Sequence, residues 1–217
     1  LTNAAGGLIR VLEGTAGQRN LGLELDNRGT LQIERSTSLN KSGGKHRFAG
    51  TVNLAVGTTL TIGTGGLVET THAGANWTGT GTLDLPSGRP LILETDFTLS
   101  TITLGLQNVI VQGPGTFTVP PGPTLTFQTT TMDAPLNLLG TLENWAASSI
   151  NGPFSVPVGG LVRVVGRLGS SHATLTVANG FANQGTIELT SQDSSFIATL
   201  NVTTGAPAVE GYSVHPF

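Results

Sequence analysis

Three carboxylates near the middle of the chain are of the type that glycan-cleaving enzymes use. In Glu94-Thr95-Asp96 the two acids are two residues apart, which on a β-strand places both side chains on one side, and Asp84 precedes Glu94 by ten residues. Hydrolysis of a glycosidic bond needs two carboxyl groups at a defined separation, and a lyase needs a base together with a cation. The catalytic hypothesis is therefore a polysaccharide lyase or hydrolase that uses Asp84, Glu94 and Asp96.

Other signatures of catalysis or metal binding are missing from the sequence. The Asn-Thr-Asp, Asp-Asp and Gly-His-Gly motifs of polygalacturonase-like sites do not occur, and neither do calcium loops, nucleotide loops or serine elbows. There is no cysteine, and the four histidines lack ligand spacing: His46, His72, His172 and His215. Since a solvated β-surface ordinarily carries a few acids, we expect no enzymatic activity, no metal site and no cofactor.

One loop region is basic and indicates a different chemistry. Arg35, Lys41, Lys45 and Arg47 occur within thirteen residues that contain no acid, whereas residues 90–162 contain no Lys or Arg. Such a loop could contact anionic glycans, although a solvated loop is the simpler interpretation. The formal net charge of −3 argues against a nucleic-acid partner, because affinity for phosphates rests on basic patches.

Threonine pairs suggest a third kind of surface. The Thr-x-Thr pattern begins at Thr59, Thr101, Thr124 and Thr174. Threonines stacked in register on a flat face could order water and bind ice. The uneven spacing of the pairs argues against a flat array, so we expect outward threonines chosen for their β propensity.

A short phrase recurs along the chain and indicates the elements that position these residues. It consists of Gly, then Thr or Gly, then an aliphatic residue, any residue and an aliphatic residue, about every 20 residues. The phrase begins at Gly6, Gly29, Gly50, Gly65, Gly81, Gly115, Gly140, Gly159 and Gly185. A degenerate copy occupies the interval from Phe97 to Leu104, and the stretch Pro135–Ser149 reads as strand and loop rather than helix.

The repeat and the composition together predict an all-β, right-handed parallel β-helix of roughly ten coils. Alternation such as Leu31/Ile33, Leu60/Ile62 and Ile187/Leu189 sends aliphatic side chains inward, and the glycine before each strand is expected to adopt a positive φ. The chain has 31 glycines, 33 threonines and only 11% charged residues, which favours strands over helices. A jelly roll or sandwich is the alternative fold, but it does not explain one phrase at each strand start.

Two copies of the repeat carry a family resemblance. The resemblance lies in Leu25-Asp26-Asn27-Arg28-Gly29-Thr30-Leu31 and in Phe181-Ala182-Asn183-Gln184-Gly185-Thr186-Ile187-Glu188-Leu189, which look like the repeats of large bacterial surface proteins. These include autotransporter passengers, filamentous-haemagglutinin-like exoproteins and giant adhesin-like repeat proteins. The resemblance covers residues 1–204 as a style of repeat, and it implies a parallel β-helix, export from a bacterium, and a role in adhesion or as a stalk.

The expected organisation is one solenoid domain over residues 1–204, cut from a longer chain, followed by an irregular tail, cap or linker over 205–217. No apolar run approaches the roughly 20 residues that cross a bilayer, so no membrane insertion is expected. We expect an extracellular or cell-surface location and a glycan or other cell-surface ligand. End-to-end self-association through exposed sheet edges is a further expectation.

Overall fold

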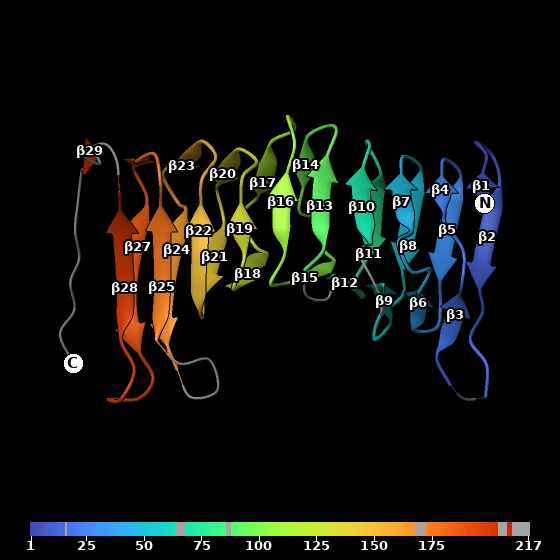
Figure 1. Cartoon of the computed structure of the whole chain (residues 1–217), viewed down its shortest axis with the longest axis horizontal. Coiled ribbons are helices and arrows are strands. Elements are labelled where there is room, and N and C mark those ends of the chain that lie inside the picture. The colour runs from blue at the N-terminus through green and yellow to red at the C-terminus, as the bar shows by residue number, and fades with distance from the viewer. Residues whose placement is uncertain (16, 64–67, 86–87, 168–171, 204–207, 210–217) are drawn as a thin grey trace.

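The computed structural model shows a parallel β-solenoid of about nine turns (Figure 1). It describes residues 1–217 except 16, 64–67, 86–87, 168–171, 204–207 and 210–217. The described residues contain strands and loops but no helix, and hence no helix that could cross a membrane. The predicted parallel β-helix is confirmed, with about one turn fewer than expected.

Each turn contributes three strands, and most strands pair in parallel with their counterparts in the next turn. We call the resulting walls face 1, face 2 and face 3. Face 1 consists of β1 (Thr2–Asn3), β4 (Asp26–Asn27), β7 (Lys45–Phe48), β10 (Glu69–His72), β13 (Pro90–Leu93), β16 (Ile110–Gln112), β19 (Thr131–Met132), β22 (Ala147–Ile150), β25 (Ala173–Val177) and β28 (Ala198–Val202).

Faces 2 and 3 complete each turn. Face 2 consists of a four-stranded sheet, β2 (Leu8–Val11), β5 (Thr30–Ile33), β8 (Thr51–Leu54) and β11 (Asn76–Gly79), and a six-stranded sheet, β14 (Phe97–Thr98), β17 (Phe117–Val119), β20 (Leu136–Leu138), β23 (Phe154–Val156), β26 (Ala182–Asn183) and β29 (Ala208–Val209). Face 3 consists of β3 (Arg19–Leu21), β6 (Thr37–Leu39), β9 (Thr59–Ile62), β12 (Thr82–Leu85), β15 (Thr103–Gln107), β18 (Thr124–Gln128), β21 (Thr141–Asn144), β24 (Leu161–Gly166) and β27 (Thr186–Ser191).

One core runs along the inside of the solenoid and is built mainly from aliphatic side chains. The predicted inward residues Leu31, Ile33, Leu60 and Ile62 are all fully buried. Leu189 departs from the prediction, because 52% of it is exposed. It stacks on the buried Val164, but β27 is the last strand of face 3 and no described strand covers it.

Most of the repeat-phrase glycines are required by close approach between turns. An added Cβ on Gly29 would lie 2.3 Å from the Gly7 carbonyl oxygen, and one on Gly50 would lie 2.0 Å from the Gly29 oxygen. The prediction of positive φ is confirmed at Gly6 (φ 80°) and Gly159 (φ 89°) but is wrong for Gly29, Gly50, Gly81, Gly115, Gly140 and Gly185. Positive φ occurs instead inside the tight turns, as at Gly57 (φ 71°), where Thr58 N donates to Ala55 O.

The phrase marks two corners of the solenoid rather than one. Gly29 and Gly50 precede strands of face 2, whereas Gly81, Gly140 and Gly185 precede strands of face 3. The copy at Gly65 lies outside the described residues except for its last position, Val68. At both corners the backbones of successive turns come close together, so the same glycine-containing phrase occurs at each.

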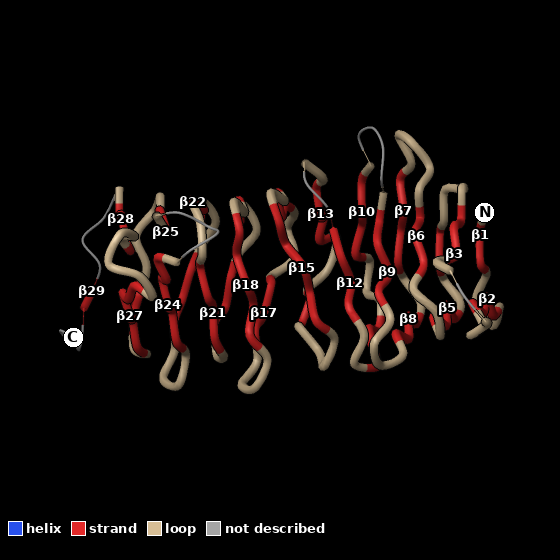
Figure 2. Tube along the Cα trace, turned by 90° about the horizontal axis from the view of Figure 1, so that it is seen from below, coloured by secondary structure: helices blue, strands red, loops and turns tan. Residues whose placement is uncertain are grey.

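Differences in turn length are taken up by the loops, which lie at the edges of the rod (Figure 2). Pro135–Ser149 forms the end of one turn and the start of the next, as strand and loop. The predicted boundary at 204 falls in a gap, and of the tail only β29 is described, which pairs in parallel with β26. The rest of the tail, including His215, lies outside the described residues.

Candidate functional site

The three candidate carboxylates do not share one strand or one face. Asp84 lies on β12 of face 3, whereas Glu94 and Asp96 lie in the corner between face 1 and face 2. The prediction that Glu94 and Asp96 sit on a strand is wrong, because β13 ends at Leu93. Both Leu93 and Phe97 point into the core, so the three residues between them must turn the chain.

Each of the three carboxylates has a structural surrounding of its own. Asp96 Oδ1 accepts a hydrogen bond from Thr116 N at 2.8 Å and so supports the corner of the next turn. Glu94 Oε2 accepts from Arg47 Nη2 at 2.9 Å. Burial raises the pKa of Asp84 above its usual value, and its carboxylate leans over Gly105 of the neighbouring turn.

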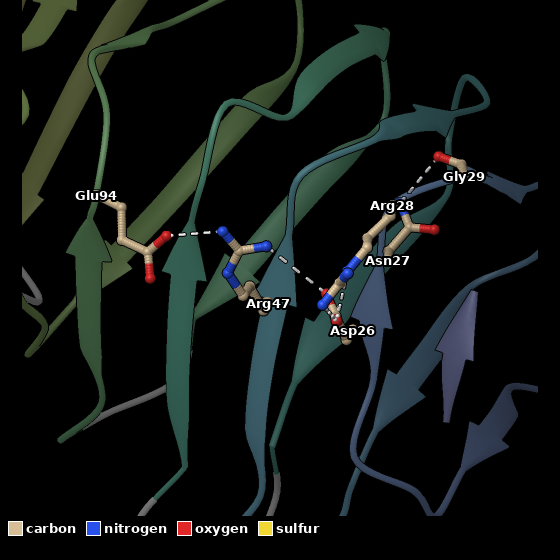
Figure 3. A network of polar contacts seen from close by, with 6 residues as sticks. All are labelled: Asp26, Asn27, Arg28, Gly29, Arg47 and Glu94. Atoms are coloured by element: carbon tan, nitrogen blue, oxygen red, sulfur yellow. Dashed lines mark hydrogen bonds and ion pairs between the residues drawn. The ribbon is translucent and has the colours of Figure 1, made fainter. Parts of the chain in front are cut away.

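A row of charges runs across four turns on and beside face 1 (Figure 3). Arg47 stacks in register on Asp26, with their charged groups 3.8 Å apart, and it reaches Glu94 two turns further along. Arg28 holds the other oxygen of Asp26 at 2.7 Å. The acids that neutralise Arg47 therefore come from turns before and after it, and no local sequence pattern reveals them.

The four candidate cations do not form one basic patch. Lys45 lies on β7 with its ammonium 3.6 Å from Glu69, and Arg47 follows on the same strand. Arg35 lies at the opposite corner of the turn, where its Nε donates to Gly17 O at 3.0 Å. Lys41 is exposed in the loop between β6 and β7. The positive charges of Lys45 and Arg47 are therefore already neutralised by acidic side chains and are not available as such to an anionic ligand.

Arg35 lines an open groove of about 540 Å³ between faces 2 and 3. Glu13 and Glu34 share its lining, and Glu34 is bound by Arg10 at 2.7 Å. The remaining lining is mostly glycine, serine and threonine. The lining of this groove carries charges of both signs and gives no indication of a preferred ligand.

Two of the histidines are buried one turn apart, which the sequence did not reveal. His46 is fully buried and His72 is 3% exposed, whereas His172 is exposed. Burial lowers the pKa of both His46 and His72. Within the described residues, no group of three or more acids and histidines is placed to hold a metal ion.

His72 is held as one neutral tautomer by two contacts. Its Nε2 lies 3.1 Å from the backbone oxygen of Asp96, so this nitrogen must carry the proton and donate. Its Nδ1 then accepts from Trp77 Nε1 at 3.3 Å. A second proton on the ring would point at the indole N–H, so protonation must break that contact.

A groove of about 440 Å³ opens beside this histidine. It is lined by His72, Gly74, Ala75, Asn76, Trp77, Asp96, Thr98 and Ser100. The groove lies at the point where the two sheets of face 2 meet without pairing, between β11 and β14. It brings the predicted residue Asp96 together with polar and aromatic side chains that sequence analysis did not connect with it.

The buried histidines predict that acid destabilises the fold. Their folded pKa values lie below the usual 6.5, so the unfolded chain binds these protons more readily. Stability should therefore be constant above pH 6.5 with respect to these groups and fall below it, by up to about 1.4 kcal/mol per pH unit for each histidine.

Urea unfolding between pH 5 and pH 8 measures this slope. His72→Phe, which keeps an aromatic ring beside Phe97, should remove about half of it. Titration of the histidine ring resonances by NMR gives the same answer in the unaltered protein. Folded-state pKa values of 6.5 or above for His46 and His72 would contradict the assignment.

Comparisons with models of known families, with characterised proteins and with solved structures found no match to this chain.

Proposed function

We propose that this chain is a non-catalytic segment of an extracellular or cell-surface protein that acts in adhesion or as a stalk. The observation that carries the proposal is the continuous core, which stacks about nine turns into a rod roughly 43 Å long at a rise of about 4.8 Å per turn. A rod of this kind separates what lies at its two ends and displays side chains along its walls. The family-like repeats at Leu25–Leu31 and Phe181–Leu189 support a bacterial surface origin.

The placement of the acids supports a role without catalysis. Glu94 and Asp96 already accept hydrogen bonds that link different turns, and Asp84 lies on another face. Paired catalytic carboxylates would instead face one another across a shared substrate site.

The test is to incubate the protein with pectin, alginate and glycosaminoglycans and to follow both binding and new chain ends. We expect association with a cell-surface ligand or glycan and no cleavage. Cleavage that disappears in Asp96→Asn or Asp84→Asn would overturn the proposal in favour of the polysaccharide-active enzyme. Asp193→Asn is the control, because Asp193 lies in the loop between β27 and β28, away from all three candidate carboxylates in the sequence.

Ice binding is a second candidate, favoured by one observation on face 3. A threonine ladder of five consecutive turns, outward and in register, runs along this face: Thr59, Thr82, Thr103, Thr124 and Thr141. The separations range from 17 to 23 residues, so the argument that uneven spacing prevents an array is wrong. The loops absorb the differences. The neighbouring outward column is mixed, with Thr61, Asp84 and Gly105 in successive turns.

A measurement of thermal hysteresis tests ice binding directly. If the threonine ladder binds ice, the protein lowers the freezing point below the melting point, and Thr103→Tyr abolishes the gap by raising a bulky ring from the face. Thr118→Tyr on face 2 should leave the gap intact. Absence of any gap in the unaltered protein would remove this candidate.

A further inference from the structure

Among the described strands, the wall of the solenoid is interrupted between β11 and β14. On face 2, β11 pairs with β8 on one side and β14 pairs with β17 on the other, but β11 and β14 do not pair with each other. Faces 1 and 3 are continuous at the same level, where β10 pairs with β13 and β12 pairs with β15. The 440 Å³ groove lies at this interruption, and its volume is within the range of about 300–1,000 Å³ typical of small-molecule sites.

The floor of the groove is aromatic and fixed in position. Trp77 is 5% exposed and packs against Phe48 with ring centroids 5.2 Å apart, while its indole N–H is bound to His72. His72 in turn meets Phe97 edge to face, with ring centroids 4.9 Å apart. These contacts hold the rings in one arrangement, so a ligand would meet a preorganised surface.

The rim of the groove offers polar groups that the described part of the protein does not engage. Asn76 and Thr98 are exposed, and neither side chain has a hydrogen bond among the described residues. Asp96 uses Oδ1 for Thr116 N, and the described residues give Oδ2 no partner. An amide, a hydroxyl and a carboxylate oxygen therefore converge on one small space.

The charges around the groove select against an anionic ligand. The groove lining contains Asp96 and no Lys or Arg, and Glu94 lies two residues before Asp96. Arg47 lies on β7, in register with Thr71 of β10, and is already paired with Glu94 and Asp26. A neutral ligand rich in hydroxyl groups satisfies the amide, the hydroxyl and the carboxylate together.

We propose that this groove binds one ring of a neutral sugar, with Asn76, Asp96 and Thr98 bonding its hydroxyls above the Trp77 floor. The inference rests on the proposed adhesive function and names the ligand class for it. The lining groups come from two successive turns, at the level where β11 and β14 do not pair. The equivalent outward positions of the next turn, such as Thr118, lie in a paired sheet.

The test is binding of the labelled protein to immobilised neutral and anionic oligosaccharides, followed by titration with the best neutral one. We expect binding to a neutral hexose-containing glycan. Asn76→Ala and Thr98→Val should each weaken it about tenfold, which corresponds to one lost hydrogen bond, and Thr118→Val should not change it. Circular dichroism and urea unfolding confirm that each variant keeps its fold.

The outcomes separate this inference from the proposed function. Binding that survives both Asn76→Ala and Thr98→Val, or binding only to anionic glycans, overturns the groove as the sugar site and leaves an adhesive rod. Adhesion to cells without binding to any glycan would likewise overturn the groove as a sugar site and leave an adhesive rod. Cleavage of a bound glycan overturns the proposed non-catalytic function itself.

Discussion

Gly50→Ala is expected to destabilise the protein by about 3 kcal/mol or more, because its Cβ would lie 2.0 Å from the Gly29 carbonyl oxygen. The neighbouring atoms are backbone, so no side-chain rotation can make room. Relief of the clash requires two turns to separate where Thr51 N donates to Gly29 O at 2.8 Å. Urea unfolding, analysed by linear extrapolation, measures the loss.

Gly22→Ala is the matched control for this variant. Gly22 is exposed, its φ is not positive, and the nearest atom to an added Cβ is Asn40 Oδ1 at 3.6 Å. Its free energy of unfolding should change by less than about 1 kcal/mol, and it should rise if the unfolded chain loses freedom. Equal losses in the two variants would contradict the close-approach explanation of the repeat-phrase glycines.

Phe117→Ala is expected to cost about 3–5 kcal/mol, because it removes a fully buried ring from the middle of the core. Phe117 stacks in register between Phe97 and Leu136, and its ring centroid is 4.8 Å from that of Phe97. The turns on both sides are fixed by backbone bonds, so they cannot collapse fully into the cavity.

Thr118→Ala tests the same strand on its outward side. Thr118 points away from the core and is only half-buried, so its replacement should change the free energy of unfolding by about 0.5 kcal/mol or less. A large difference in the free energy of unfolding between these two variants is expected for a strand in the solenoid wall and not for a loop. A Phe117→Ala protein as stable as the unaltered one would contradict the position of the core.

The fold could be predicted from the sequence because the local signals agree with one another. Alternation at Leu31/Ile33 and Leu60/Ile62 identifies the inward face, and the Gly-Thr phrase identifies the corners. The role of the glycine at Gly50 could not be predicted, since the atom that excludes a side chain belongs to Gly29, one turn away. A steric clash between two turns cannot be recognised from the sequence of either turn alone.

The surface features could not be predicted for a related reason. Arg47 meets Asp26 and Glu94 only because the loops between them have the lengths that bring these rungs together. The groove at Asp96 depends on two strands, β11 and β14, that fail to pair. The sequence indicates where the strands lie. Which surface side chains become neighbours depends on the register between turns, and this register depends on the length of every loop.

All surface assignments depend on adjacent turns lying directly over one another, and cross-linking tests this most directly. The chain has no cysteine, so the double variant Thr82→Cys/Thr103→Cys places one pair on stacked rungs of face 3, with Cα atoms about 4.8 Å apart, within disulfide range. Rapid oxidation to one intramolecular disulfide is the expected result, while Thr82→Cys/Thr118→Cys, on different faces, should stay reduced. A first pair that remains reduced while the second closes would contradict the stacking.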